Sequence, residues 1–243
     1  MTQNIRFLRF AIISFLLIFF IFNTSLFAGD TTRVSLLSQN KNHLFTSLSF
    51  GMGVDYSNNP SLKKYVQYLI PDYNSLIASD QLSDFASGLE FFVGVEKQIS
   101  KKFSLKAEYS YFIKSYNVSA KPNYDFTYRN HQPYLIANYI IPFEYFFIKV
   151  GAGAGYIISE LTVKQHGGEN TYSSSGIGMK IESVVNAQVS KSVTVYLSGF
   201  ITNTIMQDLK DKSGLDLTTS SNDKINLSSF GAGLRLGVEI YIF

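Results

Sequence analysis

Hydrophobic residues recur at every second position over eight stretches of the chain, which is the period of a β-strand with two unlike faces. The stretch at residues 230–243 shows this most regularly: every even-numbered position is apolar, while the odd positions hold glycines, Arg235, Glu239, Tyr241 and the final Phe243. The other seven stretches are residues 44–55, 86–98, 103–116, 128–141, 146–158, 176–189 and 193–204. We therefore predict eight β-strands. The fourth is the least regular, and its Pro133 indicates a bulge or an edge.

The predicted strands are joined by connections of two kinds. Tight turns are expected at residues 99–102, 142–145 and 190–192, and longer loops at 56–85, 117–127, 159–175 and 205–226. Short turns at one end and long loops at the other are typical of transmembrane β-barrels. Eight antiparallel strands also allow the sheet to close and lose its edges. The predicted fold is an all-β, eight-stranded antiparallel transmembrane barrel with short periplasmic turns and long extracellular loops.

Alternation alone does not tell which face points outward, since a soluble secreted barrel of lipocalin type would put its apolar face inside. The polar register favours the transmembrane barrel because it is rich in glycine, as a narrow interior requires. Its charges also balance, and charges enclosed in an eight-stranded barrel must pair. We predict a polar network in the lumen made of Glu90, Glu96, Lys106, Glu108, Lys114, Lys149, Lys180, Glu182, Arg235 and Glu239.

Aromatic residues gather near the predicted strand ends, as in the two interfacial girdles of transmembrane barrels. Tyr111 and Tyr156 lie towards the long loops. The group near the short turns comprises Phe103, Phe143, Tyr145, Phe146, Tyr241 and Phe243.

The N-terminus indicates export. Arg6 and Arg9 precede an apolar run at residues 11–22, which is too short for a comfortable transmembrane helix but typical of a cleaved signal peptide. We therefore expect a signal peptide at residues 1–28, a periplasmic lead-in at 29–42 and a barrel domain at 43–243.

Composition limits the function. Without Arg6 and Arg9, the 21 basic residues fall to 19 against 18 acidic ones, which excludes the basic surplus of a nucleic-acid binder. Charged residues make up 16% of the chain, against about 25% in soluble domains. There is no cysteine, so disulfides are excluded.

The signal peptide, the eight strands, the loop asymmetry and the final strand LGVEIYIF together resemble the small bacterial outer-membrane β-barrels of the OmpA-domain, OmpX and opacity-protein type. The resemblance covers essentially the whole mature chain. It implies that Tyr241 and Phe243 form the signal read by the outer-membrane insertion machinery. Residues in phase with Phe243 are, however, Tyr241, Glu239 and Arg235. Either a bulge near Tyr241 resets the face, or the terminal Phe does not face lipid.

No catalytic, cofactor-binding or metal-ligating residue is predicted. The run at 150–156, VGAGAGY, departs from the dinucleotide-binding GxGxxG pattern and lies in a predicted strand. Outer-membrane lipid-modifying enzymes need a nucleophile beside its base. The candidates here are His131 with Ser119 and Asp125, and they do not form a local motif.

The first long loop contains a predicted helix. Asn59 and Pro60 suit a helix start, Leu62, Tyr65, Val66 and Leu69 follow at helical spacing, and Pro71 ends the pattern. This helix covers the barrel mouth, lies in the lipid interface or binds a partner. Residues 205–226 are rich in Ser, Thr and Asp, as is typical of mobile surface loops.

The sequence therefore predicts a non-enzymatic outer-membrane protein with a structural or adhesion-like role, in contact with lipid and with an extracellular partner through loops 56–85 and 205–226. The alternatives are a small porin, in which the lumenal charges line an ion path, and a lipid-modifying enzyme.

Overall fold

The computed structural model describes residues 44–69, 87–118, 124–143, 146–165, 167–219 and 222–242. The predicted signal peptide, the lead-in and Phe243 lie outside these residues. Within them, no helix is long and apolar enough to cross a membrane.

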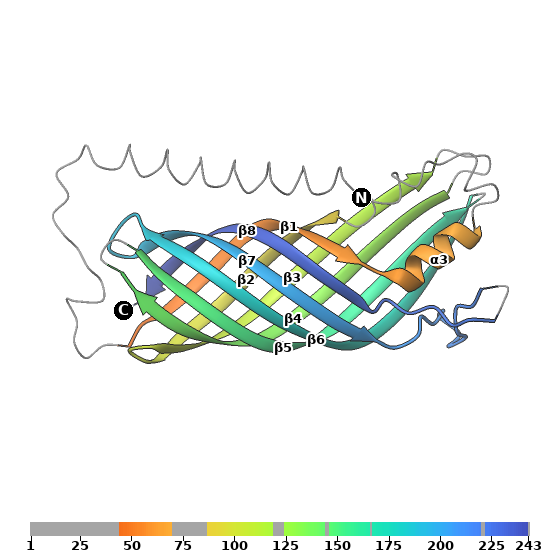
Figure 1. The fold of residues 1–243 in the computed structure, drawn as a ribbon. Helices are drawn as coiled ribbons and strands as arrows, with labels where there is room; N and C mark the ends of the chain where they lie inside the picture. Colours follow the sequence, from red (N-terminus) through yellow and green to blue (C-terminus); the bar gives the residue numbers. More distant parts are fainter. Residues whose placement is uncertain are drawn as a thin grey trace, which may run out of the picture. The chain divides into compact units, whose positions relative to one another are not determined.

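Eight strands form a closed antiparallel barrel in chain order, with β8 returning to pair with β1 (Figure 1). Their bounds are β1 (Thr46–Asn58), β2 (Ser87–Ser100), β3 (Phe103–Val118), β4 (Tyr124–Pro142), β5 (Phe146–Gln165), β6 (Gly168–Gln188), β7 (Val193–Met206) and β8 (Ser229–Ile242). The predicted fold class is confirmed. We call the end that carries the β2–β3, β4–β5 and β6–β7 turns the short-turn end, and the other the long-loop end.

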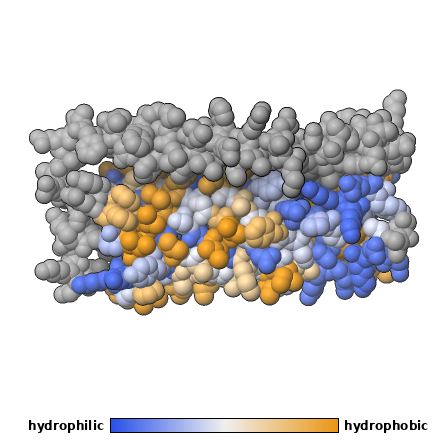
Figure 2. Space-filling view, in the orientation of Figure 1, coloured by the Kyte–Doolittle hydropathy of each residue, from blue (hydrophilic) through white to orange (hydrophobic). Residues whose placement is uncertain are grey.

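The apolar register faces outward and the charged register faces inward. Leu105, Val150 and Leu234 are 38%, 44% and 56% exposed, whereas Arg235 and Lys149 are each 2% exposed. A barrel with an apolar interior of lipocalin type is therefore excluded. In Figure 2 hydrophobic residues gather over the middle of the barrel and hydrophilic ones over the long-loop end.

The prediction of long loops at residues 117–127 and 159–175 is wrong. β3 and β4 are separated only by residues 119–123, and β5 and β6 only by 166–167, so most of 117–127 and 159–175 is strand. The continuous register from Val118↔Tyr124 to Gln165↔Gly168 makes β3 to β6 a four-stranded extension at the long-loop end. Here the hydrophobic phase is reversed: Phe126 and Leu161 face inward and are fully buried. The outer positions beyond the apolar band are polar because they face water.

The aromatic girdle at the short-turn end is present in part. The Phe103 and Tyr139 rings pack edge-on with centroids 5.2 Å apart, and Phe143 stacks on Phe146 at 4.6 Å. Tyr241 is wrong as a girdle residue, since it is 6% exposed, faces inward and packs edge-on against Phe45. The β1–β8 register is unbroken from Thr46↔Ile242 onward, so no bulge resets the face at Tyr241.

Pro133 does not mark a bulge or an edge either. It lies inside β4 with its side chain exposed, and the pairing with β5 keeps one register on both sides, at His131↔Ile158 and Tyr134↔Gly155. The β4–β5 ladder skips Gln132 and Pro133 and then resumes, as expected where proline has no N–H to donate.

Glycines in the inward register leave room for aromatic rings. A Cβ added at Gly233 would lie 2.3 Å from the Phe200 ring, and one at Gly237 would lie 2.6 Å from the Tyr196 ring. Rings from β7 therefore occupy volume that ordinary side chains on β8 would fill, which packs the narrow interior.

One helix, α3 (Pro60–Leu69), follows β1 directly and lies at the long-loop end (Figure 1). Pro60 occupies the first helical position, and the Lys63 N–H donates to the Asn59 carbonyl over 3.1 Å. Asn59 precedes the helix as expected, but its side-chain amide does not cap the helix N–H groups, because it binds other partners. Its Oδ1 accepts from Lys114 Nζ at 2.8 Å, and its Nδ2 donates to the Leu227 carbonyl at 3.0 Å.

Candidate functional site

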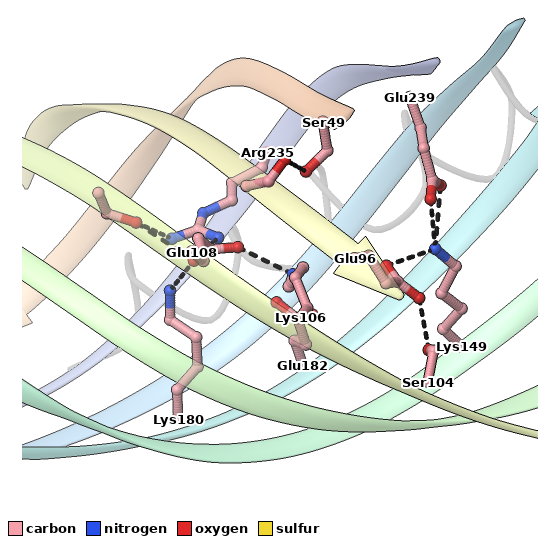
Figure 3. Close-up of polar contacts among 12 residues, drawn as sticks. Ser49, Glu96, Ser104, Lys106, Glu108, Lys149, Lys180, Glu182, Arg235 and Glu239 are labelled. Atoms are coloured by element: carbon pink, nitrogen blue, oxygen red, sulfur yellow. Dashed lines mark hydrogen bonds and ion pairs between the residues drawn. The ribbon is translucent and has the colours of Figure 1, made fainter. Parts of the chain in front are cut away.

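The ten residues of the predicted lumenal network all lie inside the barrel, and none is more than 7% exposed. The structure divides them into two ion-pair groups and one separate lysine. Each group draws its members from strands on different sides of the barrel, so the side chains meet in the lumen rather than along the wall (Figure 3).

The central ion-pair group contains three cations and three carboxylates: Arg235, Lys106, Lys180, Glu90, Glu108 and Glu182. Glu108 is its hub, since Lys106 Nζ, Lys180 Nζ and Arg235 Nη1 each lie 2.8 Å from one of its oxygens. Arg235 also donates to both oxygens of Glu90, and Lys106 pairs with Glu182. The group is electrically balanced, as burial of charge requires.

The turn-side ion-pair group lies closer to the short-turn end. Lys149 Nζ stands 2.7 Å from Glu96 Oε2 and 2.9 Å from Glu239 Oε1 (Figure 3). The hydroxyls of Ser47 and Ser104 donate to Glu239 and Glu96. The single ammonium of Lys149 and two serine hydroxyls together satisfy the two carboxylates, which compensates part of the cost of taking them out of water.

Lys114 belongs to neither group. It donates to Ser57 Oγ at 3.2 Å and to Asn59 Oδ1 at 2.8 Å, and its Nζ lies 4.8 Å from the centre of the Tyr128 ring. Lys114 therefore connects the barrel wall to the start of α3.

Sequence reasoning missed one lumenal carboxylate and several lumenal rings. Asp55 is 5% exposed, and its inward register, shared with Gly51 and Gly53, was the available signal. The rings stack on the cations: the Arg235 guanidinium carbon lies 4.7 Å from the centre of Phe92 and 4.4 Å from that of Phe200. Cation–π contacts of this kind strengthen when they are desolvated.

The long-loop end is closed by a second, apolar layer. Leu62, Tyr65 and Val66 of α3 are at most 4% exposed, and Leu69 packs partly against the same cluster. The cluster joins α3 to the inner face of the strand extension and to residues 207–219 and 222–228, which we call the cap segment. Further members of the cluster include Phe112, Phe126, Leu161, Leu209, Leu217, Ile225 and Leu227. The helix lies over the barrel mouth, which is the first of its three predicted positions. We call α3 together with the cap segment the cap.

The cap segment is folded, which differs from the mobile loop expected at 205–226. Leu209, Leu217 and Ile225 recur every eight residues and close a ring of backbone hydrogen bonds. Leu217 N–H donates to Leu209 O over 2.8 Å, Ile225 N–H to Leu217 O over 3.0 Å, and Leu209 N–H to Ile225 O over 2.8 Å. The side chains of these three residues are buried. Their eight-residue spacing was therefore a sequence signal of a folded segment, which a search for two-residue strand periodicity does not detect.

On the solvent side of this ring, Lys224 lies 2.7 Å from Asp216 and 3.8 Å from Asp208. The hydrogen bond from Lys224 holds the pKa of the Asp216 carboxyl below its ordinary value, and the same bond raises the pKa of Lys224. Lys224 is exposed and the two aspartates are partly exposed, so water screens their attraction.

The candidate enzyme residues do not assemble in the described part of the chain. His131 faces outward from β4, and its Nδ1 lies 2.6 Å from the Tyr109 hydroxyl. Asp125 is six positions away on the same strand, which is about 20 Å, and Ser119 lies outside the described residues. The glycines of the 150–156 run line β5, and no group of three or more metal-ligating side chains occurs among the residues described.

Comparisons with known proteins point to the fold. No protein-family model matches the chain, and no curated protein matches it. Among solved structures, a major outer membrane protein from Thermus thermophilus is 11% identical, with 81% of this chain and 99% of that chain covered and a TM-score of 0.52. Ail, the attachment invasion locus protein of Yersinia pestis, in complex with the heparin analogue sucrose octasulfate, is 8% identical, with coverages of 83% and 100% and a TM-score of 0.50.

Neisserial surface protein A is 12% identical, with 82% of this chain and 99% of that chain covered and a TM-score of 0.45. At these identities the likeness concerns the fold. The chain has the fold of the small eight-stranded outer-membrane β-barrels.

Proposed function

We propose that this protein is a non-enzymatic, non-conducting β-barrel of the outer membrane of Gram-negative-type cells. In this proposal the signal peptide at residues 1–28 exports it, the insertion machinery assembles it, and its short turns face the periplasm. Its folded cap then lies on the cell surface, where it supports a structural or surface-interaction role.

The observation that carries the proposal is the filled lumen. The interior of an eight-stranded barrel is just wide enough for side chains. The central ion-pair group crosses this interior from β2, β3, β6 and β8, and Phe92 and Phe200 pack against Arg235. Ion passage would require these buried pairs to separate, which costs several kcal/mol per unpaired charge.

The apolar cluster under the cap adds a second closure above the first. Val66 of α3, Leu209 of the cap segment and Phe126 of the barrel wall belong to this cluster. Each is fully buried, so no solvent lies between the cap and the wall at this point. A pore would need both layers to open.

Planar-bilayer recording of the folded monomer tests the lack of conductance. We expect no stable conductance step above the leak of the lipid. A variant that lacks the cap segment is the matched comparison, and it too should stay closed because the central ion-pair group remains. Large and stable steps from the unmodified protein would refute the proposal and favour the porin alternative.

The cap supports the surface role because it presents ordered backbone rather than a free chain. Replacement of the cap segment by a short turn should leave the barrel folded, as seen by heat-dependent mobility on gels. It should abolish attachment of protein-bearing vesicles to surfaces coated with host matrix proteins or glycans. Attachment that persists without the cap segment would contradict a role for the cap.

A further inference from the structure

The short-turn end of the barrel is basic. Lys97 of β2, Lys101 and Lys102 of the β2–β3 turn, and Lys191 of the β6–β7 turn are all exposed. We call these four residues the basic collar. Exposed or half-buried carboxylates of the described residues all lie at the opposite end, on the extension of β4–β6 or in the cap segment. Glu144, in the β4–β5 turn, lies outside the described residues.

Apolar side chains flank the collar lysines at the extreme end of the barrel. Ile99, Phe103 and Val189 are 59%, 53% and 68% exposed. Large apolar residues in exposed turns are unfavourable in water, whereas a mixture of lysine and apolar residues is typical of segments at the boundary between lipid headgroups and acyl chains. Lysine suits this depth because its methylene stem lies along apolar surface while its ammonium reaches the headgroups.

The collar lysines lie on two opposite sides of the barrel instead of forming one pocket. In the closed strand order, β4 and β5 separate the two lysine-bearing turns on one side, and β8 and β1 separate them on the other, so the turns lie on opposite sides of the barrel. A compact anion could contact only one turn at a time. A planar anionic surface that encircles the protein contacts both.

The two turns are braced in the same way. Ser100 Oγ accepts hydrogen bonds from the N–H of Phe103 at 3.2 Å and of Lys102 at 3.4 Å. Ser190 Oγ accepts from the N–H of Ser192 at 3.4 Å. In both turns a lysine follows the bracing serine directly, so the serine satisfies local backbone while the lysine side chain remains available.

We propose that the basic collar binds the phosphate headgroups of anionic phospholipids in the membrane leaflet at the short-turn end. The proposal rests on the membrane orientation in the proposed function. It selects lipid over a periplasmic polymer such as peptidoglycan because the lysines are interleaved with exposed apolar side chains and spread around the rim. Each lysine near an anionic surface is expected to raise the local preference for anionic lipid by about fivefold at low salt.

The test is electron spin resonance of the full-length mature protein in phosphatidylcholine vesicles that contain spin-labelled phosphatidylglycerol or spin-labelled phosphatidylcholine. The ratio of the two association constants measures the preference. We expect a ratio above one for the unmodified protein at low salt, and a value of about one after combined Lys97→Gln, Lys101→Gln, Lys102→Gln and Lys191→Gln substitution. Raising the salt concentration should lower the ratio of the unmodified protein.

The matched control removes the same charge from the other end: Lys63→Gln, Lys64→Gln, Lys210→Gln and Lys212→Gln. It should keep the preference for phosphatidylglycerol. A ratio of one in the unmodified protein, or equal loss in both variants, would overturn the proposal. The proposal would also be overturned if the collar variant kept its preference for phosphatidylglycerol but no longer pelleted with purified peptidoglycan. Conductance recordings report separately on the proposed function, because a conducting barrel can still have a lipid-binding collar.

Discussion

The sharpest consequence of the lumenal network concerns Glu108. Substitution of Glu108 by Gln keeps the shape of the side chain and removes its charge. The central ion-pair group then has three cations and only two carboxylates. Lys106 keeps Glu182 and Arg235 keeps Glu90, but Lys180 loses its ion-pair partner while its side chain stays fully buried.

Removal of one partner from a buried ion pair costs about 3–5 kcal/mol, because the remaining charge is left uncompensated. Against a typical unfolding free energy of about 5–15 kcal/mol, that is a large fraction of the total stability. The substitution Glu108→Gln is therefore expected to lower the free energy of unfolding by about 3–5 kcal/mol. The measurement is urea unfolding of the barrel in lipid vesicles, followed by gel mobility and circular dichroism.

A compensating change separates charge balance from shape. Lys180→Met in the Glu108→Gln background restores two cations against two carboxylates. The methionine is one atom shorter and would lie beside the Tyr134 and Phe200 rings, whose centres are 4.5 Å and 5.0 Å from Lys180 Nζ, which favours sulfur–aromatic contact. Most of the lost stability should return, because hydrophobic replacement of buried ion pairs is often neutral or better.

Exposed Glu169 provides the control for the Glu108 experiment. It lies 3.4 Å from Lys164 with both side chains more than half exposed, so Glu169→Gln should change stability by less than about 0.5 kcal/mol. Equal costs of Glu108→Gln and Glu169→Gln, or a double variant no more stable than Glu108→Gln alone, would contradict an uncompensated buried charge on Lys180.

Three further predictions address the cap and the packing of the lumen. Leu62→Ala should destabilise the cap by about 2–5 kcal/mol through the cavity it leaves, so limited proteolysis should cut the cap segment faster while the barrel strands stay protected; equal protection would contradict this. Because the pKa of Asp216 is lowered and that of Lys224 is raised, their pair should stabilise the cap above the ordinary carboxyl pKa of 3.8 and below the ordinary lysine pKa of 10.5. The stabilisation is lost as pH falls through the lowered Asp216 pKa or rises through the raised Lys224 pKa. NMR titration in a Lys224→Gln variant should show the pKa of Asp216 moving up towards 3.8. An unchanged pKa would refute Lys224 as the cause of the shift. Gly233→Ala should cost about 1–3 kcal/mol, because the added Cβ would lie 2.3 Å from the Phe200 ring and 2.7 Å from the Val54 carbonyl oxygen. Phe200→Leu in the same chain should recover only the part of the loss that the ring causes, as measured by urea unfolding, whereas an additive loss would contradict any contribution of the ring.

Much of the barrel follows from the sequence because each strand has two environments of opposite polarity. In β8 the charges of Arg235 and Glu239 indicate the inward side of a barrel that spans lipid, since arginine and glutamate are destabilising on a lipid-facing surface. The inward register likewise determines which charges meet in the lumen, because side-chain direction in a strand repeats every two residues. Number of strands, tight turns and the inward face were therefore predictable.

Only the tertiary structure shows where along a strand the inward face becomes apolar. In β5 the inward face turns from glycines and Lys149 to apolar residues such as Leu161 towards the cap, so a prediction that assumes one hydrophobic phase ends the strand too early. In β4 the inward face is apolar along much of its length, with Ile136 and Ile140 buried as well as Phe126. Tyr241 faces inward because β8 keeps its register with β1 to the last described pair, which the composition of the strand end does not reveal.

The sequence by itself therefore determined the two faces of the regularly alternating strands, whereas only the closed structure decided which side chains meet across the lumen. Glu108 is separated from Lys180 by 72 residues and from Arg235 by 127, and no local pattern links them. The same holds for Leu62 and Leu209 in the cap. Such partners are selected by the diameter of the barrel and the stagger of its strands, which depend on all eight strands closing together.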